Sequence, residues 1–149
     1  MKIAIGSDHG GFELKQHIIS HLEARNFEIK DCGTYNLDSV DYPDYGKETA
    51  ESVADGDCDL GIVVCTTGQG IMISANKVKG IRCALLSDVY SAEMTRMHND
   101  TNMIALGGGV VGKGLAVRIV DAWLDAEFEG GRHERRVNKI TDIESKYCR

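Results

Sequence analysis

The chain has 149 residues, of which 42% are hydrophobic and 27% charged, and its formal net charge is −6. This length corresponds to about one domain of ~100–200 residues, which buries enough surface to fold without disulfides or metal. The apolar fraction excludes a disordered chain, and no apolar run reaches the ~18 residues of a membrane helix. The negative charge argues against a nucleic-acid scaffold. We therefore predict a single domain over residues 1–149 that binds neither nucleic acid nor membrane.

Five short apolar runs alternate with helical patterns along the chain. The runs predicted as strands are residues 2–5, 27–29, 60–65, 81–86 and 103–106. The predicted helices are one carrying Leu14, Ile18 and Leu22, then 45–54, a short one beginning near Gly70, 88–97, and one carrying Leu115, Ile119 and Trp123. Continuous apolar strands separated by helices indicate a parallel sheet covered on both faces. We predict an α/β fold, with three doubly wound (Rossmann-like) layers around a five-stranded parallel sheet.

A final basic helix is predicted over residues 132–147, after Gly130 and Gly131. Its apolar positions form a thin stripe, namely Val137, Ile140, Ile143 and Tyr147. A terminal helix with such a narrow apolar face packs either on its own domain or on a partner subunit.

Three glycine-rich segments directly follow predicted strands, at residues 6–11, 66–70 and 107–112. In an open parallel sheet, ligands bind beyond the carboxyl ends of the strands. Free N–H groups at helix N-termini suit phosphate or an oxyanion. The sequence therefore predicts a small anionic ligand at this edge of the sheet.

Several binding motifs are present only in part. Residues 107–112 match G-x-G-x-x-G, but no strand follows, and Gly114 stands where a phosphate loop needs Ser or Thr. The acidic residues of 55–59 lack the glycine and glutamate of a calcium loop, and His17 and His21 have no third ligand nearby in the sequence. We therefore predict no cofactor and no bound metal.

The cysteines and the first residues bear on the cellular compartment. The five cysteines are odd in number and contain no C-x-x-C, so we predict free thiols rather than disulfides or structural zinc. The first residues lack the apolar stretch of ~7–15 residues found in secretory signals. We expect a cytoplasmic protein.

Cys65 ends a predicted strand and is followed by the loop from Thr66 to Gly70. Thiols at helix N-termini ionise more readily than free thiols. Thr67 and the backbone N–H groups of this loop can stabilise an oxyanion next to the sulfur. The alternative is that Cys65 is a small buried hydrophobic residue.

Further polar residues are candidates for the same site. His98, which precedes the fifth strand, is expected near the same sheet edge as Cys65, where it either shuttles protons or caps a helix. Asp8-His9 lies in the first glycine loop, where an Asx turn is the alternative. Arg132 and Arg136, one helical turn apart, form either an anion clamp or a solvated basic face.

The chain resembles the B-type ribose-5-phosphate isomerases, a family that includes allose-6-phosphate and galactose-6-phosphate isomerases. The resemblance runs from residue 2 to about residue 145, in order and with matching spacing. The segments that carry it are GSDHGGF at 6–12, DYP at 41–43, CTTGQGI at 65–71, ANK at 75–77, HNDTN at 98–102 and EGGRH at 129–133.

The resemblance implies a metal-free aldose–ketose isomerisation of a sugar phosphate through a cis-enediol. It implies a homodimer in which the C-terminal helix reaches a partner subunit and completes its active site, and it leaves open whether dimers pair into tetramers. The implied catalytic residues are Cys65 as the base between C1 and C2, Thr67 at the enediolate oxygen, His98 for ring opening and Asp8 beside the ring oxygen. The implied substrate-binding residues are Tyr42 and Asn99 for the sugar, the loop residues Thr66, Gly68, Gln69 and Gly70, and His9, Arg132 and Arg136 for the phosphate.

Three positions bear on the branch of the family and on the substrate. Some members use Glu where this chain has Ile71, so Cys65 places the chain with the thiol-using branch. Gly109 stands where members commonly carry Arg, and Thr66 replaces a frequent Gly. The loss of this arginine leaves the phosphate affinity and the preferred sugar open.

The leading hypothesis is interconversion of ribose 5-phosphate and ribulose 5-phosphate. Alternatives are a six-carbon phosphate such as allose 6-phosphate, a non-catalytic phosphosugar-binding protein, and a flavodoxin-like nucleotide binder. The joint presence of Cys65, Thr67 and His98 favours an enzyme, because binding alone needs no base.

Overall fold

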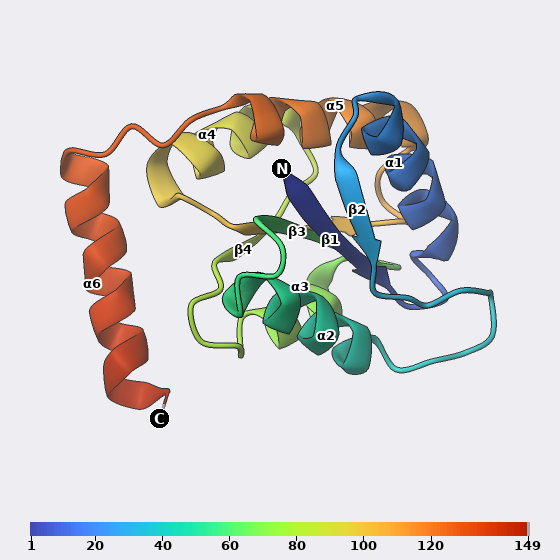
Figure 1. Ribbon diagram of the computed structural model, residues 1–149, viewed down its shortest axis with the longest axis horizontal. Helices are drawn as coiled ribbons and strands as arrows, with labels where there is room; N and C mark the ends of the chain where they lie inside the picture. The colour runs from blue at the N-terminus through green and yellow to red at the C-terminus, as the bar shows by residue number, and fades with distance from the viewer. Residues whose placement is uncertain (149) are drawn as a thin grey trace.

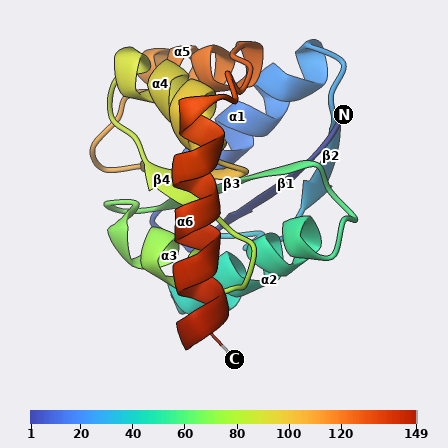
Figure 2. The same ribbon diagram turned by 90° about the vertical axis from the view of Figure 1, so that its left-hand side faces the viewer.

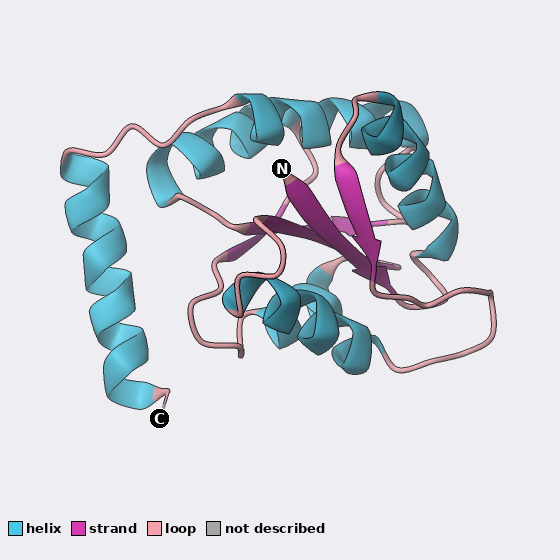
Figure 3. Ribbon diagram, viewed as in Figure 1, coloured by secondary structure: helices cyan, strands magenta, loops and turns pink. Residues whose placement is uncertain are grey.

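A computed structural model describes residues 1–148 and contains a five-stranded sheet with helices on both faces (Figures 1 and 3). The strands are β1 (Lys2–Ser7), β2 (Glu28–Asp31), β3 (Leu60–Cys65), β4 (Cys83–Leu85) and β5 (Met103–Gly107). The helices are α1 (Phe12–Ala24), α2 (Tyr42–Ala54), α3 (Gln69–Ala75), α4 (Val89–Asn99), α5 (Lys113–Asp125) and α6 (Arg132–Tyr147). All neighbouring strands are parallel, in the order β2-β1-β3-β5-β4.

The sheet separates two hydrophobic clusters. Helices α1, α4 and α5 cover one face, while α2 and α3 cover the other (Figure 1). Alternate side chains of a strand point to opposite faces. Thus Ile62 and Val64 of β3 join the cluster under α1 and α5, whereas Val63 and Cys65 join the cluster over α2 and α3. The predicted doubly wound α/β fold is confirmed.

Several element boundaries differ from the prediction. Helix α2 begins at Tyr42 rather than at residue 45, because Pro43 suits the first turn of a helix. Strand β4 is shorter than predicted, since the Arg82 N–H donates to the Asn102 side chain (2.8 Å) instead of a neighbouring strand. Helix α4 continues to Asn99 and ends where Asp100 adopts a left-handed conformation. His98 therefore belongs to the last helical turn rather than to a loop.

The strand register brings the three glycine-rich segments to one edge of the sheet. Ser7 at the end of β1 pairs with Val64, and Cys65 at the end of β3 pairs with Gly107 at the end of β5. We call this the carboxyl edge, and the opposite edge, where Gly61 pairs with Met103, the amino edge. The predicted convergence of the glycine loops is confirmed.

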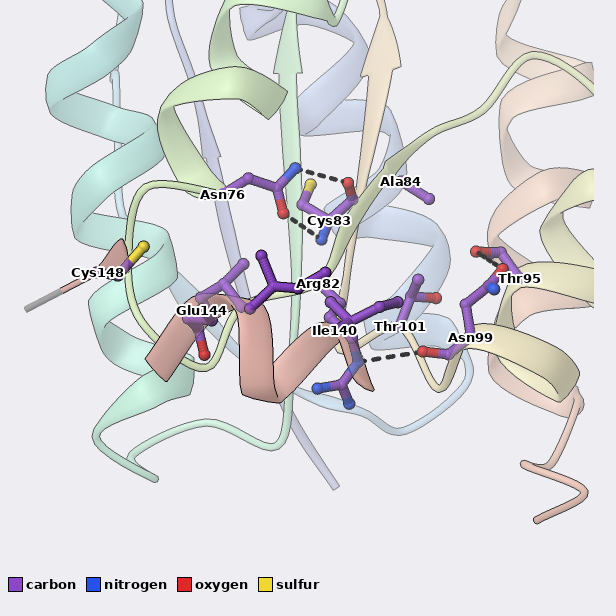
Figure 4. A pocket seen from close by; sticks show the side chains of 12 residues that line it. Asn76, Arg82, Cys83, Ala84, Thr95, Asn99, Thr101, Ile140, Glu144 and Cys148 are labelled. Carbon is purple, nitrogen blue, oxygen red and sulfur yellow. Dashed lines mark hydrogen bonds between the residues drawn. The ribbon is translucent and has the colours of Figure 1, made fainter. Parts of the chain in front are cut away.

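Helix α6 stands apart from the three layers and crosses in front of the sheet, between β4 and β3 in the view of Figure 2, next to the starts of β4 and β5. Its main contact with the body is with α4, and the Gly80 N–H donates to the Glu144 carboxylate (2.9 Å). A groove of about 440 Å³ remains between α6 and the body, with Ile140 and Glu144 on one side and Cys83 and Asn99 on the other (Figure 4).

None of the helices within residues 1–148 combines the length and apolarity needed to cross a bilayer.

Candidate active site

Three backbone loops meet closely at the carboxyl edge. The Gly108 N–H donates to the Cys65 carbonyl (2.8 Å), and the Gly109 N–H donates to the Thr66 carbonyl (2.9 Å). A Cβ atom on Gly10 would lie only 2.1 Å from the Thr66 hydroxyl oxygen. Only glycine permits this approach, so the loops form one continuous backbone floor.

Cys65 lies at the base of this floor. Its side chain is almost fully buried, and the Gly68 N–H donates to its sulfur at 3.1 Å. Gly68 has φ +78°, and a Cβ there would lie 2.8 Å from the carbonyl carbon of Leu106, so no other residue fits without strain. The left-handed backbone conformation of Gly68 therefore directs its N–H group at the Cys65 sulfur.

Three residues near Cys65 in the sequence, Thr66, Thr67 and Ile71, also lie around it in the structure. The Gln69 N–H donates to the Thr67 hydroxyl (3.3 Å), which holds this hydroxyl over the start of α3. Ile71 is fully buried and packs in the same cluster as Cys65. Thr66 is not among the residues with positive φ, so replacement of glycine at this position introduces no backbone strain.

Asp8, His9 and Tyr42 lie at the same edge. The Asp8 carboxylate is buried and accepts the Gly11 N–H (3.1 Å) at the start of α1. The His9 Nδ1 atom accepts the Val40 N–H (3.2 Å), so a proton on this neutral ring sits on Nε2, which can donate to an anion. The Tyr42 ring covers Gly70, where a Cβ would lie 2.6 Å from it.

His98 and Asn99 lie elsewhere, at the amino edge. The Arg82 guanidinium donates to the Asn99 carbonyl (3.1 Å), and Arg82 directly precedes β4 at that edge. Four residues of β3 separate the two edges, which is about 13 Å at ~3.3 Å per residue. The expectation that His98 lies at the same sheet edge as Cys65 is wrong within one chain, because a helix that precedes a parallel strand ends at the amino edge.

A second histidine accompanies His98 at the amino edge. The rings of His98 and His133 stack with centroids 4.1 Å apart and planes within 6°. Glu129 faces both, with its Oε2 atom 3.3 Å from the Nε2 atom of His133 and 4.0 Å from that of His98. Burial, and then the charge of the adjacent His98, lower the pKa of His133.

Glu129 and His133 match no motif that the sequence alone reveals, although both lie within the family segment at 129–133. Their separation of four residues was the available signal, because such spacing often places two side chains together at a helix start.

Arg132 and Arg136 begin α6 and are exposed. Within residues 1–148, the ion pairs of this region involve Glu129 with the two histidines rather than either arginine. Both arginines are therefore free to bind an external anion. They share the amino edge with His98 and not the carboxyl edge with Cys65.

The sequence and the fold match proteins of known family. Residues 3–140 match the family model described as Ribose/Galactose Isomerase. The chain is 52% identical to "Ribose-5-phosphate isomerase B" of Escherichia coli (strain K12), with 97% of each chain covered.

Solved structures of members of the same family match the fold of this chain. A structure of Clostridium thermocellum ribose-5-phosphate isomerase B has a TM-score of 0.98 at 58% identity and covers 99% of both chains. A structure of Mycoplasma genitalium ribose-5-phosphate isomerase B with bound ribulose-5-phosphate has a TM-score of 0.92 at 41% identity, with 97% of each chain covered. The chain belongs to the ribose/galactose isomerase family.

Proposed function

We propose that this chain interconverts ribose 5-phosphate and ribulose 5-phosphate, with Cys65 as the base. The observation that carries this proposal is the Cys65 sulfur itself, which receives the Gly68 N–H at 3.1 Å beneath three converging glycine loops. A non-catalytic sugar-binding protein would need no such nucleophilic group. The E. coli and C. thermocellum relatives, whose names state this activity, support the same assignment.

The chemistry requires a base beside the sugar carbon and a trap for charge on oxygen. The Cys65 thiolate takes the proton from C2 of the open-chain aldose, and the remaining electron pair forms the double bond of a cis-enediol. The backbone N–H groups of residues 66–70 and the Thr67 hydroxyl stabilise the negative oxygen. Return of the proton to C1, together with transfer of the hydroxyl proton from O2 to O1, gives the ketose with its carbonyl at C2. Electrons are neither gained nor lost, so the step needs no redox partner.

Four further residues expected at the active site lie at the amino edge, far from Cys65 of the same chain, namely His98, Asn99, Arg132 and Arg136. We propose that a second copy of this chain supplies them. In a homodimer, His98 and Asn99 of one protomer would face Cys65 of its partner. The surface of α6 supports such an association, because its apolar residues Ile143 and Tyr147 are 61% and 70% exposed. Exposed apolar surface of this kind favours burial against a second protein.

In this arrangement, side chains from both protomers open the furanose ring of the sugar and bind its phosphate. His98 exchanges a proton with the ring oxygen, while Asp8 lies on the other side of the sugar. His9 offers its Nε2–H to the phosphate, and Arg132 and Arg136 of the other protomer supply its positive charge. Tyr42, Gln69 and Gly70 line the sugar.

The cytoplasm is the compartment that fits this mechanism. All five cysteines are free in the structure, and a thiol base must stay reduced to act. Reducing compartments maintain this state.

The preferred sugar is tested by comparing the turnover of ribose 5-phosphate with that of allose 6-phosphate. One additional carbon unit in a fitted pocket changes kcat/KM by roughly 10–200-fold, and we expect ribose 5-phosphate to be preferred by this margin. EDTA should not lower the rate, because no step uses a metal.

The reverse preference would support the six-carbon alternative. A protein that binds both sugars and converts neither would contradict the enzyme assignment.

Replacing Arg136 with alanine should raise KM for the sugar phosphate while leaving kcat within about twofold. Hydrogen bonds to charged groups contribute about 1.5–3 kcal/mol, so KM should rise roughly 10- to 100-fold. Gly109 supplies no cation near the phosphate, which increases the share carried by this arginine. Steady-state kinetics of Arg136→Ala measure both constants.

The matched control is Arg135→Ala, since Arg135 is also exposed on the first turns of α6 but points to a different side. This control should keep the wild-type KM. Equal effects of both variants would indicate only general electrostatic attraction, not a phosphate clamp.

A further inference from the structure

We propose that His98, Glu129 and His133 form a binding site for a divalent cation of the Zn²⁺ class. Within residues 1–148, these three residues are the group whose imidazole nitrogens and carboxylate oxygen all lie within 4.8 Å of one another. They come from the end of α4, the segment before α6, and the first turn of α6. Neither the isomerisation chemistry nor the phosphate clamp uses Glu129 or His133.

An unpartnered buried atom points into this group. The Nε2 atom of His133 is inaccessible to solvent and has no hydrogen-bond partner, although it lies 3.3 Å from the Glu129 carboxylate. The His133 side chain is only 8% exposed. A buried polar atom without a partner is costly, and a cation bound between this nitrogen and the carboxylate would satisfy both.

The donor set favours zinc over harder cations. Two imidazoles and one carboxylate leave a fourth position for water, an arrangement typical of open zinc sites. Magnesium and calcium prefer oxygen ligands, which are in the minority here.

The site requires a modest rearrangement of one ring. Ligand atoms around a tetrahedral zinc ion lie about 3.4 Å apart for bonds of ~2.0–2.1 Å, which His133 and Glu129 already approach. Two parallel rings cannot aim both lone pairs at one ion, so the His98 ring must tilt. His98 is partly exposed at the end of α4, whereas the backbone of Glu129 is held by the Met97 carbonyl (3.0 Å).

The consequence for activity rests on the proposed function. If His98 opens the sugar ring, an ion bound to its nitrogen removes it from proton transfer. Zinc would then act as a reversible inhibitor rather than as a cofactor.

The test is titration of the full-length Cys148→Ser protein with Co²⁺, a spectroscopic substitute for Zn²⁺, followed by displacement with Zn²⁺. Removing the exposed Cys148 avoids binding to that thiol. We expect one ion per chain, the visible bands of tetrahedral Co²⁺, and no sulfur-to-cobalt charge-transfer band. Glu129→Gln and His133→Gln should each weaken binding at least about a hundredfold, since even indirect partners of a metal contribute 10- to 100-fold.

The matched control is His17→Gln/His21→Gln, which removes two histidines that lie four residues apart on α1 and should bind Co²⁺ as tightly as the parent. Unchanged affinity in both Glu129→Gln and His133→Gln would overturn the site, as would a charge-transfer band from Cys65. Each variant is also assayed with Zn²⁺ against its own metal-free rate. Inhibition of the parent that is relieved in both variants supports the inhibitory role, and binding without inhibition would overturn that role.

These binding measurements need no turnover. Failure of the metal-free protein to convert any sugar phosphate would contradict the proposed function alone.

Discussion

The Cys65→Ala protein is expected to lose turnover of ribose 5-phosphate by about 10²–10⁴-fold, the usual contribution of a positioned base. Alanine has no group that can accept the C2 proton. The substitution leaves the backbone N–H groups and the Thr67 hydroxyl of the loop in place, so binding of an unreactive analogue such as a pentitol 5-phosphate should stay within about threefold. Turnover is measured by ketose formation and binding by calorimetry.

Two further variants separate the chemical role of Cys65 from a structural one. Cys65→Ser keeps an acceptor for the Gly68 N–H but replaces the thiol with a much weaker acid, so it should be nearly as inactive as Cys65→Ala. Cys148→Ser removes an exposed thiol and should keep wild-type turnover. Activity of Cys65→Ala above a hundredth of the wild-type rate would place the base at another residue.

The sheet and the carboxyl edge could be predicted because both follow from local patterns. Continuous apolar runs identify buried parallel strands, and parallel strands bring their carboxyl ends together. This reasoning placed Asp8, His9 and the loop after Cys65 side by side, as the structure has them. The element boundaries were less predictable, since β4 is shortened by a side-chain contact between residues distant in the sequence.

The sheet edge of His98 follows from the same patterns, and the expectation was wrong because it overlooked this: His98 precedes the fifth strand, and a segment that precedes a parallel strand lies at the amino edge. The proximity of His98 to His133, 35 positions further along the chain, could not be predicted in this way. Only the packing of α6 against α4 brings these two rings together.

The separation of Cys65 from His98 leads to the second large expected effect, restoration of activity in mixed dimers. Cys65→Ala and His98→Asn should each be nearly inactive alone on the cyclic substrate. A hybrid of the two contains one site in which both residues are mutated and one in which both are intact. Random pairing in a twofold dimer makes about half of the dimers hybrids, so about a quarter of the wild-type activity should return.

The measurement mixes the two proteins after mild denaturation and refolding, with mass spectrometry of intact dimers to confirm subunit exchange. Mixing Cys65→Ala with Cys65→Ser is the matched control, because no pairing of these chains restores a base. If exchange is confirmed and the Cys65→Ala and His98→Asn mixture stays inactive, each chain uses its own His98. In that case α4 would have to move by about the distance from Gly61 to Cys65 along β3, roughly 13 Å at ~3.3 Å per residue, for the two groups to meet. Such a movement would break the packing of α4 on α5 and the hydrogen bond from Trp123 to Thr101, so the shared site is the arrangement that leaves the fold intact.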